Sequence, residues 1–224
     1  MKKLLALLIL ISLLLGKDNL TKRQYKNVAH FGNSICKHPI ISGVWWGDWG
    51  MAATTRENDY VHKFLSFMKE KNKNATSDAF NIAAWETNYA TFNKSTMDPY
   101  LVGKDLVVVR LGENVTYYTD FQNQYKILIQ YIQSKAPNAD IILGGQFWTN
   151  AQKETAMKNV ATELGLPFVS VNHLDSATYK QTVGGIVYGD DGNTHTITDS
   201  GVAIHPNDLG MQKIAEALFS AANY

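Results

Sequence analysis

Short apolar runs bounded by turn residues recur along the chain, and each is short enough to be a buried strand. These runs cover residues 28–31, 79–83, 105–111, 140–143 and 167–171. The stretch at 106–109 is apolar without alternation, which indicates a strand that is covered on both faces. Strands of this kind are typical of a parallel sheet that lies between two layers of helices.

The segments between these runs carry apolar residues three and four positions apart, as amphipathic helices do. Such stripes occupy residues 60–68, 121–132, 157–164 and 211–219. Pro206 suits the first turn of the last helix. Strands that alternate with helices over this length predict an α/β protein, a three-layer α/β/α sandwich around about five mostly parallel strands.

The first sixteen residues differ in character from the rest of the chain. Lys2 and Lys3 precede an apolar run at 4–15 that only Ser12 interrupts. Twelve residues make roughly 18 Å of helix, which is short of the ~30 Å hydrocarbon core of a bilayer. Residues 1–16 therefore resemble a bacterial export signal, and they predict a periplasmic, cell-surface or secreted protein without a stable membrane span.

The remainder predicts a single domain over residues 24–222, because no repeat or Pro/Gly-rich linker divides it. The 224 residues include 21 basic and 20 acidic side chains, a formal net charge of +1. This balance offers no basic surplus for nucleic acid or an anionic bilayer. The single cysteine, Cys36, excludes an intramolecular disulfide and a zinc site built on paired cysteines. We expect neither a cofactor nor a metal.

Polar and aromatic residues follow the predicted strands directly, and the carboxyl ends of parallel strands share one edge of a sheet. Ser34, Trp85, Asn114 and Trp148 follow the first four strands, and His205 precedes the last helix. A serine at such a turn can present its hydroxyl, and its own N–H can donate to an oxyanion. A histidine with an ordinary pKa near 6.5 can act as general base, and Asn114 adds a neutral donor. These are the parts of an acyl-transfer site.

Three short blocks resemble, in order, the first, third and fifth sequence blocks of the SGNH (GDSL-type) hydrolases. They are Gly32-Asn33-Ser34, Gly112-Glu113-Asn114 and His205-Pro206-Asn207-Asp208-Leu209-Gly210. The resemblance implies a flavodoxin-like sandwich and a serine esterase with Ser34 as nucleophile and His205 as base. It also implies that the Asn114 amide, the Ser34 N–H and a backbone N–H near Trp85 hold the oxyanion.

The chain departs from the family pattern at four places. Asn33 and Val115 stand where the family has aspartates, and residues 84–86 lack the glycine of the second block. Val202 occupies the position three residues before the histidine, where the family has its acid. The group that orients the His205 ring is therefore open.

Three interpretations of the orienting group fit the sequence. Asp199, six residues before His205, can swing in across Ser200 and Gly201. A backbone carbonyl can hold the ring in a Ser–His dyad. A carboxylate from elsewhere, such as Glu86 or Asp208, can substitute.

Residues 43–53 are glycine-rich and contain three tryptophans, Trp45, Trp46 and Trp49. One interpretation is an aromatic wall, extended by Trp85 and Trp148, that binds sugar rings or encloses a small acyl group. The other is that the rings pack a long loop onto the domain. The segment also resembles a bacterial SGNH subgroup of exported, carbohydrate-directed proteins.

The export signal and the tryptophan-rich segment favour a small-molecule or glycan ester as the substrate. The leading interpretation is an O-acetyl group on a carbohydrate or polysaccharide. A lipase or thioesterase, an acyltransferase, and a catalytically impaired glycan-binding protein also fit the sequence.

Overall fold

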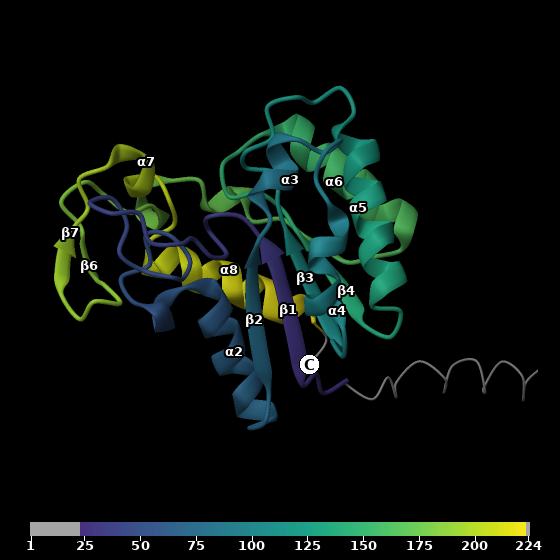
Figure 1. The fold of residues 1–224 in the computed structure, drawn as a ribbon, viewed down its shortest axis with the longest axis horizontal. Coiled ribbons are helices and arrows are strands. Elements are labelled where there is room, and N and C mark those ends of the chain that lie inside the picture. Colours follow the sequence, from purple (N-terminus) through teal and green to yellow (C-terminus); the bar gives the residue numbers. More distant parts are fainter. Residues whose placement is uncertain (1–22, 223–224) are drawn as a thin grey trace, which may run out of the picture.

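Five strands form a parallel sheet at the centre of the computed structural model, which describes residues 23–222. The strands are β1 (Asn27–Gly32), β2 (Thr76–Asn81), β3 (Leu106–Arg110), β4 (Asp140–Gly144) and β5 (Phe168–Val169). They lie in the order β2-β1-β3-β4-β5, and every neighbouring pair is parallel (Figure 1). The predicted α/β fold with about five parallel strands is confirmed.

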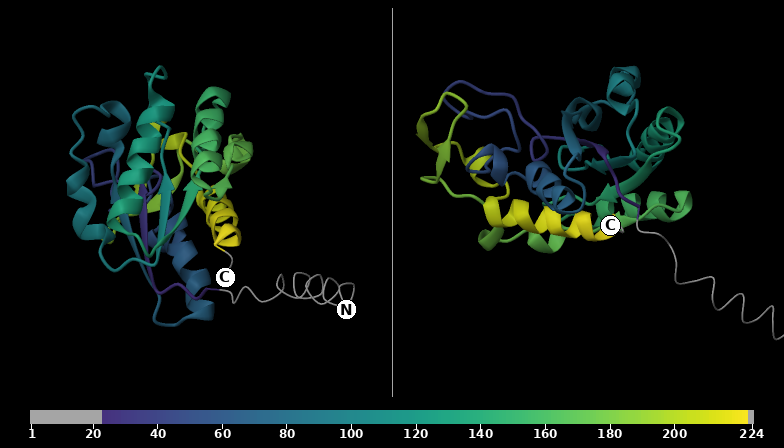
Figure 2. Two further views of the ribbon diagram at one scale, coloured as in Figure 1. Left: turned by 90° about the vertical axis from the view of Figure 1, so that its right-hand side faces the viewer. Right: turned by 90° about the horizontal axis from the view of Figure 1, so that it is seen from below.

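Helices cover both faces of this sheet. The α-helices are α2 (Tyr60–Lys71), α3 (Ala83–Thr87), α4 (Asp98–Leu101), α5 (Phe121–Lys135), α6 (Ala151–Leu164), α7 (Ser200–Ala203) and α8 (Asp208–Ala221). Short 3-10 helices are η1 (Arg56–Asn58), η2 (Lys94–Met97), η3 (Asn172–Leu174) and η4 (Ala177–Tyr179). α2 and α8 lie on one face, and α4, α5 and α6 lie on the other (Figures 1 and 2). Their apolar side chains form two clusters with those of the strands, one on each face. β3 is buried at all of its positions, as its unbroken apolar run indicates.

Two predicted boundaries are wrong. β2 begins at Thr76 and ends at Asn81, so Ile82 is the N-cap of α3 and Ala83 is its first residue, and neither belongs to the strand. Pro206 lies before α8 and not in its first turn, because Asn207 is the N-cap and its side chain accepts from the Gly210 N–H. Asparagine is among the strongest N-cap residues, so the helix begins one position after it.

The loop that follows β1 packs against a distant part of the chain. A two-stranded antiparallel hairpin, β6 (Ile186–Tyr188) and β7 (Thr194–Thr196), lies beside residues 33–59 (Figure 1). The Tyr188 N–H donates to the Thr54 carbonyl, and the Asp190 N–H donates to the Trp46 carbonyl, both at 2.9 Å. Together with α7, these segments form a lobe beside the sheet.

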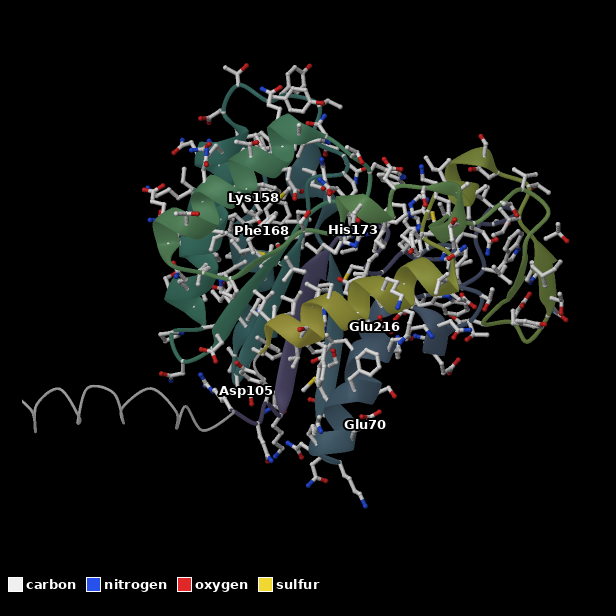
Figure 3. All side chains as sticks on the ribbon, turned by 180° about the vertical axis from the view of Figure 1, so that it is seen from behind. Glu70, Asp105, Lys158, Phe168, His173 and Glu216 are labelled. Atoms are coloured by element: carbon white, nitrogen blue, oxygen red, sulfur yellow. The ribbon has the colours of Figure 1, made fainter. Side chains whose placement is uncertain are left out.

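Because the five strands are parallel, the sheet has an amino edge and a carboxyl edge, and different loops lie at each. Asp105, which precedes β3, and His173, which follows β5, lie toward opposite ends of the sheet (Figure 3). Gly32 ends β1 where a side chain would not fit, because an added Cβ would lie 2.5 Å from the Cys36 Cβ. The chain can therefore turn tightly back after β1, at the carboxyl edge.

The predicted export signal at 1–16 lies outside the described residues. Among residues 23–222, none of the helices combines the length and the apolar character needed to cross a bilayer.

A histidine is buried in the apolar layer between the sheet and α2. His30 on β1 is 0% exposed and meets the rings of Tyr60 and Phe64 edge-on, at centroid distances of 5.5 and 5.0 Å. Both of its ring nitrogens are buried without a hydrogen-bond partner among the described residues. Burial lowers the pKa of His30 to about 3, so the folded protein keeps this ring neutral.

Replacing His30 with leucine should make the fold less sensitive to acid. Between the ordinary pKa of 6.5 and about 3, the unfolded chain binds a proton on His30 that the folded chain does not, so stability falls as the pH is lowered. From about pH 7 to about pH 5, the unfolding free energy of the wild type should drop by about 1–2 kcal/mol more than that of His30→Leu. Urea unfolding at the two pH values measures this, and an equal drop in both proteins would contradict it.

Candidate active site

Ser34 and His205 meet at the carboxyl edge of the sheet. The Ser34 Oγ lies 2.8 Å from the His205 Nε2, although the two residues are 171 positions apart in the chain. Ser34 lies in a turn after β1, and His205 lies between α7 and α8 and is 8% exposed. The sequence predicts this pair, and the structure brings the two residues into hydrogen-bond distance.

A tight turn presents Ser34, and no helix follows this turn directly. The Asn33 carbonyl accepts from the N–H groups of Cys36 and Lys37, at 2.9 and 3.0 Å. The Ser34 carbonyl accepts from the Met51 N–H at 2.8 Å. The tryptophan-containing loop at residues 43–53 thus folds back onto the turn and bonds its backbone.

A backbone carbonyl fixes the orientation of the His205 ring. Its Nδ1 lies 2.7 Å from the Gly201 carbonyl oxygen. A carbonyl can only accept, so Nδ1 carries the hydrogen and Nε2 is left to accept the Ser34 hydroxyl proton. Trp148 meets the His205 ring edge-on at 5.1 Å, and its Nε1 donates to the Ile204 carbonyl at 3.1 Å. Both contacts hold the ring toward Ser34.

The three carboxylates considered for this orienting role have other partners. The Asp199 carboxylate is the N-cap of α7 and accepts from the Val202 N–H at 2.9 Å. Asp208 accepts from the N–H and hydroxyl of Thr54, at 2.8 and 2.5 Å. Glu86 accepts from donors around Asn114. Of the interpretations left open by the sequence, the contact at Nδ1 corresponds to the backbone carbonyl.

Burial also sets the protonation of His205. It lowers the pKa of the ring to about 4, although the bond to the Gly201 carbonyl opposes this shift. A ring with this pKa is neutral near neutral pH and has a free lone pair on Nε2. The geometry and the protonation state agree on a base that is ready to accept a proton.

Asn114 lies on the loop after β3, and its side chain is held by a buried glutamate. The Asn114 Nδ2 donates to the Glu86 Oε2 at 2.6 Å. The Glu86 Oε1 accepts from the Gly112 N–H at 2.5 Å and lies 3.2 Å from the Asn33 Nδ2. Glu86, on α3, is only 2% exposed. It therefore joins the turn that carries Ser34 to the loop that carries Asn114.

A second buried glutamate lies beside the first. Glu113 pairs with Arg110 at 2.5 Å, accepts from the Phe147 N–H at 2.9 Å and accepts from the Asn33 Nδ2 at 2.7 Å. Burial would raise the pKa of Glu113, but Arg110 and the N–H donors outweigh it and the pKa is lowered. Burial raises the pKa of Glu86, and the nearby Glu113 charge adds to the rise.

Lys153 completes this polar cluster from α6. Its ammonium donates to the carbonyls of Gly112, Glu113 and Val115, at 2.6, 3.2 and 3.3 Å. Gly112 has φ +123, a conformation that favours glycine. The loop that carries Asn114 is thus fixed on several sides. Among residues 23–222, no group of three or more His, Cys, Asp or Glu side chains is arranged to hold a metal ion.

Arg110, Glu113 and Lys153 belong to the site although we had not predicted them from the sequence. A signal for two of them is present in the sequence, because Arg110 ends an otherwise apolar strand and Glu113 follows it three positions later. A charge in a buried strand needs a partner. For Lys153 we find no such signal, because an exposed-looking lysine near a helix start is common.

The tryptophans divide into two groups, which corrects the expectation of one aromatic wall. Trp45 and Trp49 are 0% and 3% exposed and lie in the core, so they pack the loop onto the domain. Trp46 is half-buried and stacks on His195, with ring centroids 4.4 Å apart. Trp148 is also half-buried, and its ring contacts the ring of His205.

The backbone N–H of Trp85 itself is engaged within α3, so a donor near Trp85 would have to be another N–H. That N–H donates to the Ile82 carbonyl at 2.9 Å, and the ring is 1% exposed. The ring packs near Phe121 and Tyr125 of α5, at centroid distances of 6.3 and 6.1 Å. Trp85 therefore anchors α3, the short helix that carries Glu86.

Comparison of sequences gives no relative, because no family model matches the chain and no curated protein matches it. Comparison with solved structures does find similar proteins. A carbohydrate esterase family 2 enzyme with a carbohydrate-binding domain, from Corynascus thermopiles (Myceliophthora fergusii), superposes with a TM-score of 0.53 at 14% identity, over 88% of this chain and 65% of that one. A two-domain esterase active on acetylated mannans, crystallised with mannopentaose, gives 0.57 at 16% identity, over 87% and 48%.

A salicylyl-acyltransferase from a tetracycline biosynthetic pathway gives a TM-score of 0.51 at 16% identity, over 87% of this chain and 54% of that one. These esterases and the acyltransferase are SGNH-type hydrolases. The chain has the SGNH hydrolase fold. It spans less than two thirds of the length of each of these three proteins, so the likeness concerns the SGNH fold and not the whole of each protein.

The neutral state of His205 can be measured directly. Because burial lowers its pKa to about 4, its ring nitrogens should titrate with a midpoint well below the ordinary 6.5. Nitrogen-15 NMR of histidine-labelled protein measures the midpoint, and the His205→Gln variant assigns the signal. A midpoint at or above 6.5 would show that the ring is not held in the buried, carbonyl-bonded position.

Proposed function

We propose that this protein is a serine esterase that removes O-acetyl groups from a carbohydrate or polysaccharide through an acyl-enzyme. The observation that carries the proposal is the 2.8 Å contact between the Ser34 Oγ and the His205 Nε2, with the opposite ring nitrogen held by the Gly201 carbonyl. A hydroxyl and a neutral imidazole in this relation are an activated nucleophile and its base.

In the first half-reaction, the Ser34 Oγ attacks the ester carbonyl carbon while the His205 Nε2 takes the hydroxyl proton. The carbonyl oxygen becomes an oxyanion, which the Asn114 amide and the Ser34 N–H stabilise as donors. The tetrahedral intermediate collapses, the bond to the sugar oxygen breaks, and His205 gives its proton to that oxygen. The products are a free sugar hydroxyl and an acetyl group on Ser34.

In the second half-reaction, water attacks the acetyl carbonyl and gives a proton to His205. Collapse of the second intermediate releases acetate and returns the proton to Ser34. Throughout, the Gly201 carbonyl accepts the Nδ1 hydrogen and favours the imidazolium that forms in each half-reaction.

Three observations support a carbohydrate ester as the substrate. Proteins with this fold include an esterase active on acetylated mannans. Trp148 lies half-buried beside His205, where an aromatic ring can contact the apolar face of a sugar. The near-neutral charge of the chain suits a neutral glycan better than a phosphorylated one.

Replacing Ser34 with alanine should abolish the activity and keep the fold. We expect hydrolysis of a short aryl acetate to fall by at least ~10³-fold, because the attacking oxygen is removed. A fluorophosphonate probe should label the wild type on Ser34 and leave Ser34→Ala unlabelled. An unlabelled and inactive wild type would favour a glycan-binding protein.

The preferred acyl group and acceptor distinguish an acetylesterase from related enzymes in the same assay. Faster turnover of long acyl chains than of acetate would favour a lipase or thioesterase. Acyl transfer to an added sugar that outruns hydrolysis would favour an acyltransferase.

Replacing Asp199 with asparagine separates a Ser–His dyad from an Asp199-assisted site. Asparagine caps helices about as well as aspartate, so α7 and the Gly201 carbonyl stay in place and kcat/KM should remain within about threefold of wild type. Kinetics on the same aryl acetate measure the effect. A loss of ~10²-fold or more would mean that the carboxylate itself acts on His205.

A further inference from the structure

The Asn114 amide has two ends, and only one of them can stabilise an oxyanion. Its nitrogen carries two hydrogens that can donate, whereas its oxygen can only accept. An oxygen turned toward the developing charge would repel it. The amide can lie in two orientations, which exchange its nitrogen and its oxygen. A site that uses it as a donor must hold the orientation with the nitrogen toward the oxyanion.

Glu86 selects one orientation. Its carboxylate accepts hydrogen bonds from three residues, each through an N–H. The donors are the Asn114 Nδ2 at 2.6 Å, the Gly112 N–H at 2.5 Å and the Asn33 Nδ2 at 3.2 Å. An acceptor surrounded in this way would repel the Asn114 Oδ1. With one amide hydrogen bound to Glu86, the second is left for another acceptor.

Glu86 is itself held in place. Trp85, next to it on α3, is buried against Phe121 and Tyr125 of α5. Asn33 is held as well, since its Oδ1 accepts from the Ile35 N–H at 3.2 Å, which leaves its Nδ2 for the two glutamates. The nucleophile turn and the Asn114 loop thus meet on one buried carboxylate.

The ion pairing in the cluster belongs to Glu113 and not to Glu86. Glu113 pairs with Arg110, and the Lys153 ammonium bonds backbone carbonyls. The hydrogen-bond donors around Glu86 are neutral amides. A buried carboxylate is costly unless donors offset its desolvation, and here those donors come from the turn beside the nucleophile and from the Asn114 loop.

We propose that Glu86 is a positioning residue, which holds the Asn114 amide with an N–H directed at the ester oxyanion and ties it to the Ser34 turn through Asn33. This inference rests on the proposed esterase function. Residues 84–86 lack the glycine of the second block, and on this proposal α3 supplies instead a carboxylate that orients a donor from the neighbouring loop.

A double-mutant cycle tests the inference. In Glu86→Gln, the side chain keeps its size but offers an amide that can bond Asn114 in either orientation. We expect kcat on an aryl acetate to fall by ~10²-fold with KM within about threefold, since the lost interaction acts in the transition state. If Glu86 acts through Asn114, the double variant Glu86→Gln/Asn114→Ala should be no slower than Asn114→Ala alone.

Glu154→Gln is the matched control. Glu154 on α6 is a buried glutamate of similar exposure, 4% against 2%, whose carboxylate lies 3.7 Å from the Lys158 ammonium. The same chemical change there should leave kcat within about twofold, because no group of the site bonds it. Thermal unfolding of each variant shows whether a loss of activity follows a loss of fold.

The side-chain amide of Asn114 gives a readout that needs no substrate. Its nitrogen-15 and proton NMR signals should shift in Glu86→Gln and stay unchanged in Glu154→Gln. An active wild type with additive losses, or with Glu86→Gln at wild-type kcat, would overturn this inference alone. An inactive wild type would overturn the proposed function and this inference with it.

Discussion

The site depends on a cluster of buried ionisable side chains at the carboxyl ends of β1 and β3. Arg110, Glu113 and Glu86 are removed from water, so each must find its partners within the protein. The carboxylates accept from the Gly112 N–H of the loop after β3, from the Phe147 N–H of the loop after β4 and from the Asn33 amide of the turn after β1. Hydrogen bonds are strong in a low-dielectric interior, so these bonds fix the loops after β1, β3 and β4, which the sheet alone would only bring near one another.

The opposite side of the site is built differently. His205 comes from the lobe formed by α7, the hairpin and the long loop after β1, and its ring is held by the Gly201 carbonyl and the edge of Trp148. The tryptophans expected to face a substrate instead give this lobe its core, since Trp45 and Trp49 are buried there. Their area stabilises a glycine-rich loop that lacks a long helix of its own, and that loop supports the Ser34 turn.

The sequence was sufficient for the sheet, because buried parallel strands have an unbroken apolar pattern. The pairing of Ser34 with His205 was expected from the resemblance of the short sequence blocks to those of SGNH hydrolases, since His205 precedes a helix and does not follow a strand. The sequence was insufficient for the backbone group that holds the His205 ring. The bond from His205 to the Gly201 carbonyl depends on the path of a four-residue helix and leaves no side-chain signature. The glutamates were equally hidden, since Glu86 and Asn114 are 28 positions apart and meet only after folding.

In the proposed mechanism, the two sides of the site compensate each other. A carbonyl dipole stabilises the imidazolium less than a full carboxylate charge, and burial disfavours that cation further, as the low pKa of His205 indicates. Less of the transition-state charge is then stabilised at the base, so more must be stabilised at the oxyanion. A donor that is already oriented costs no reorganisation when the charge develops. In the proposed mechanism, the buried Glu86 serves the reaction because its carboxylate accepts from the Asn114 amide and so orients the donor to the oxyanion.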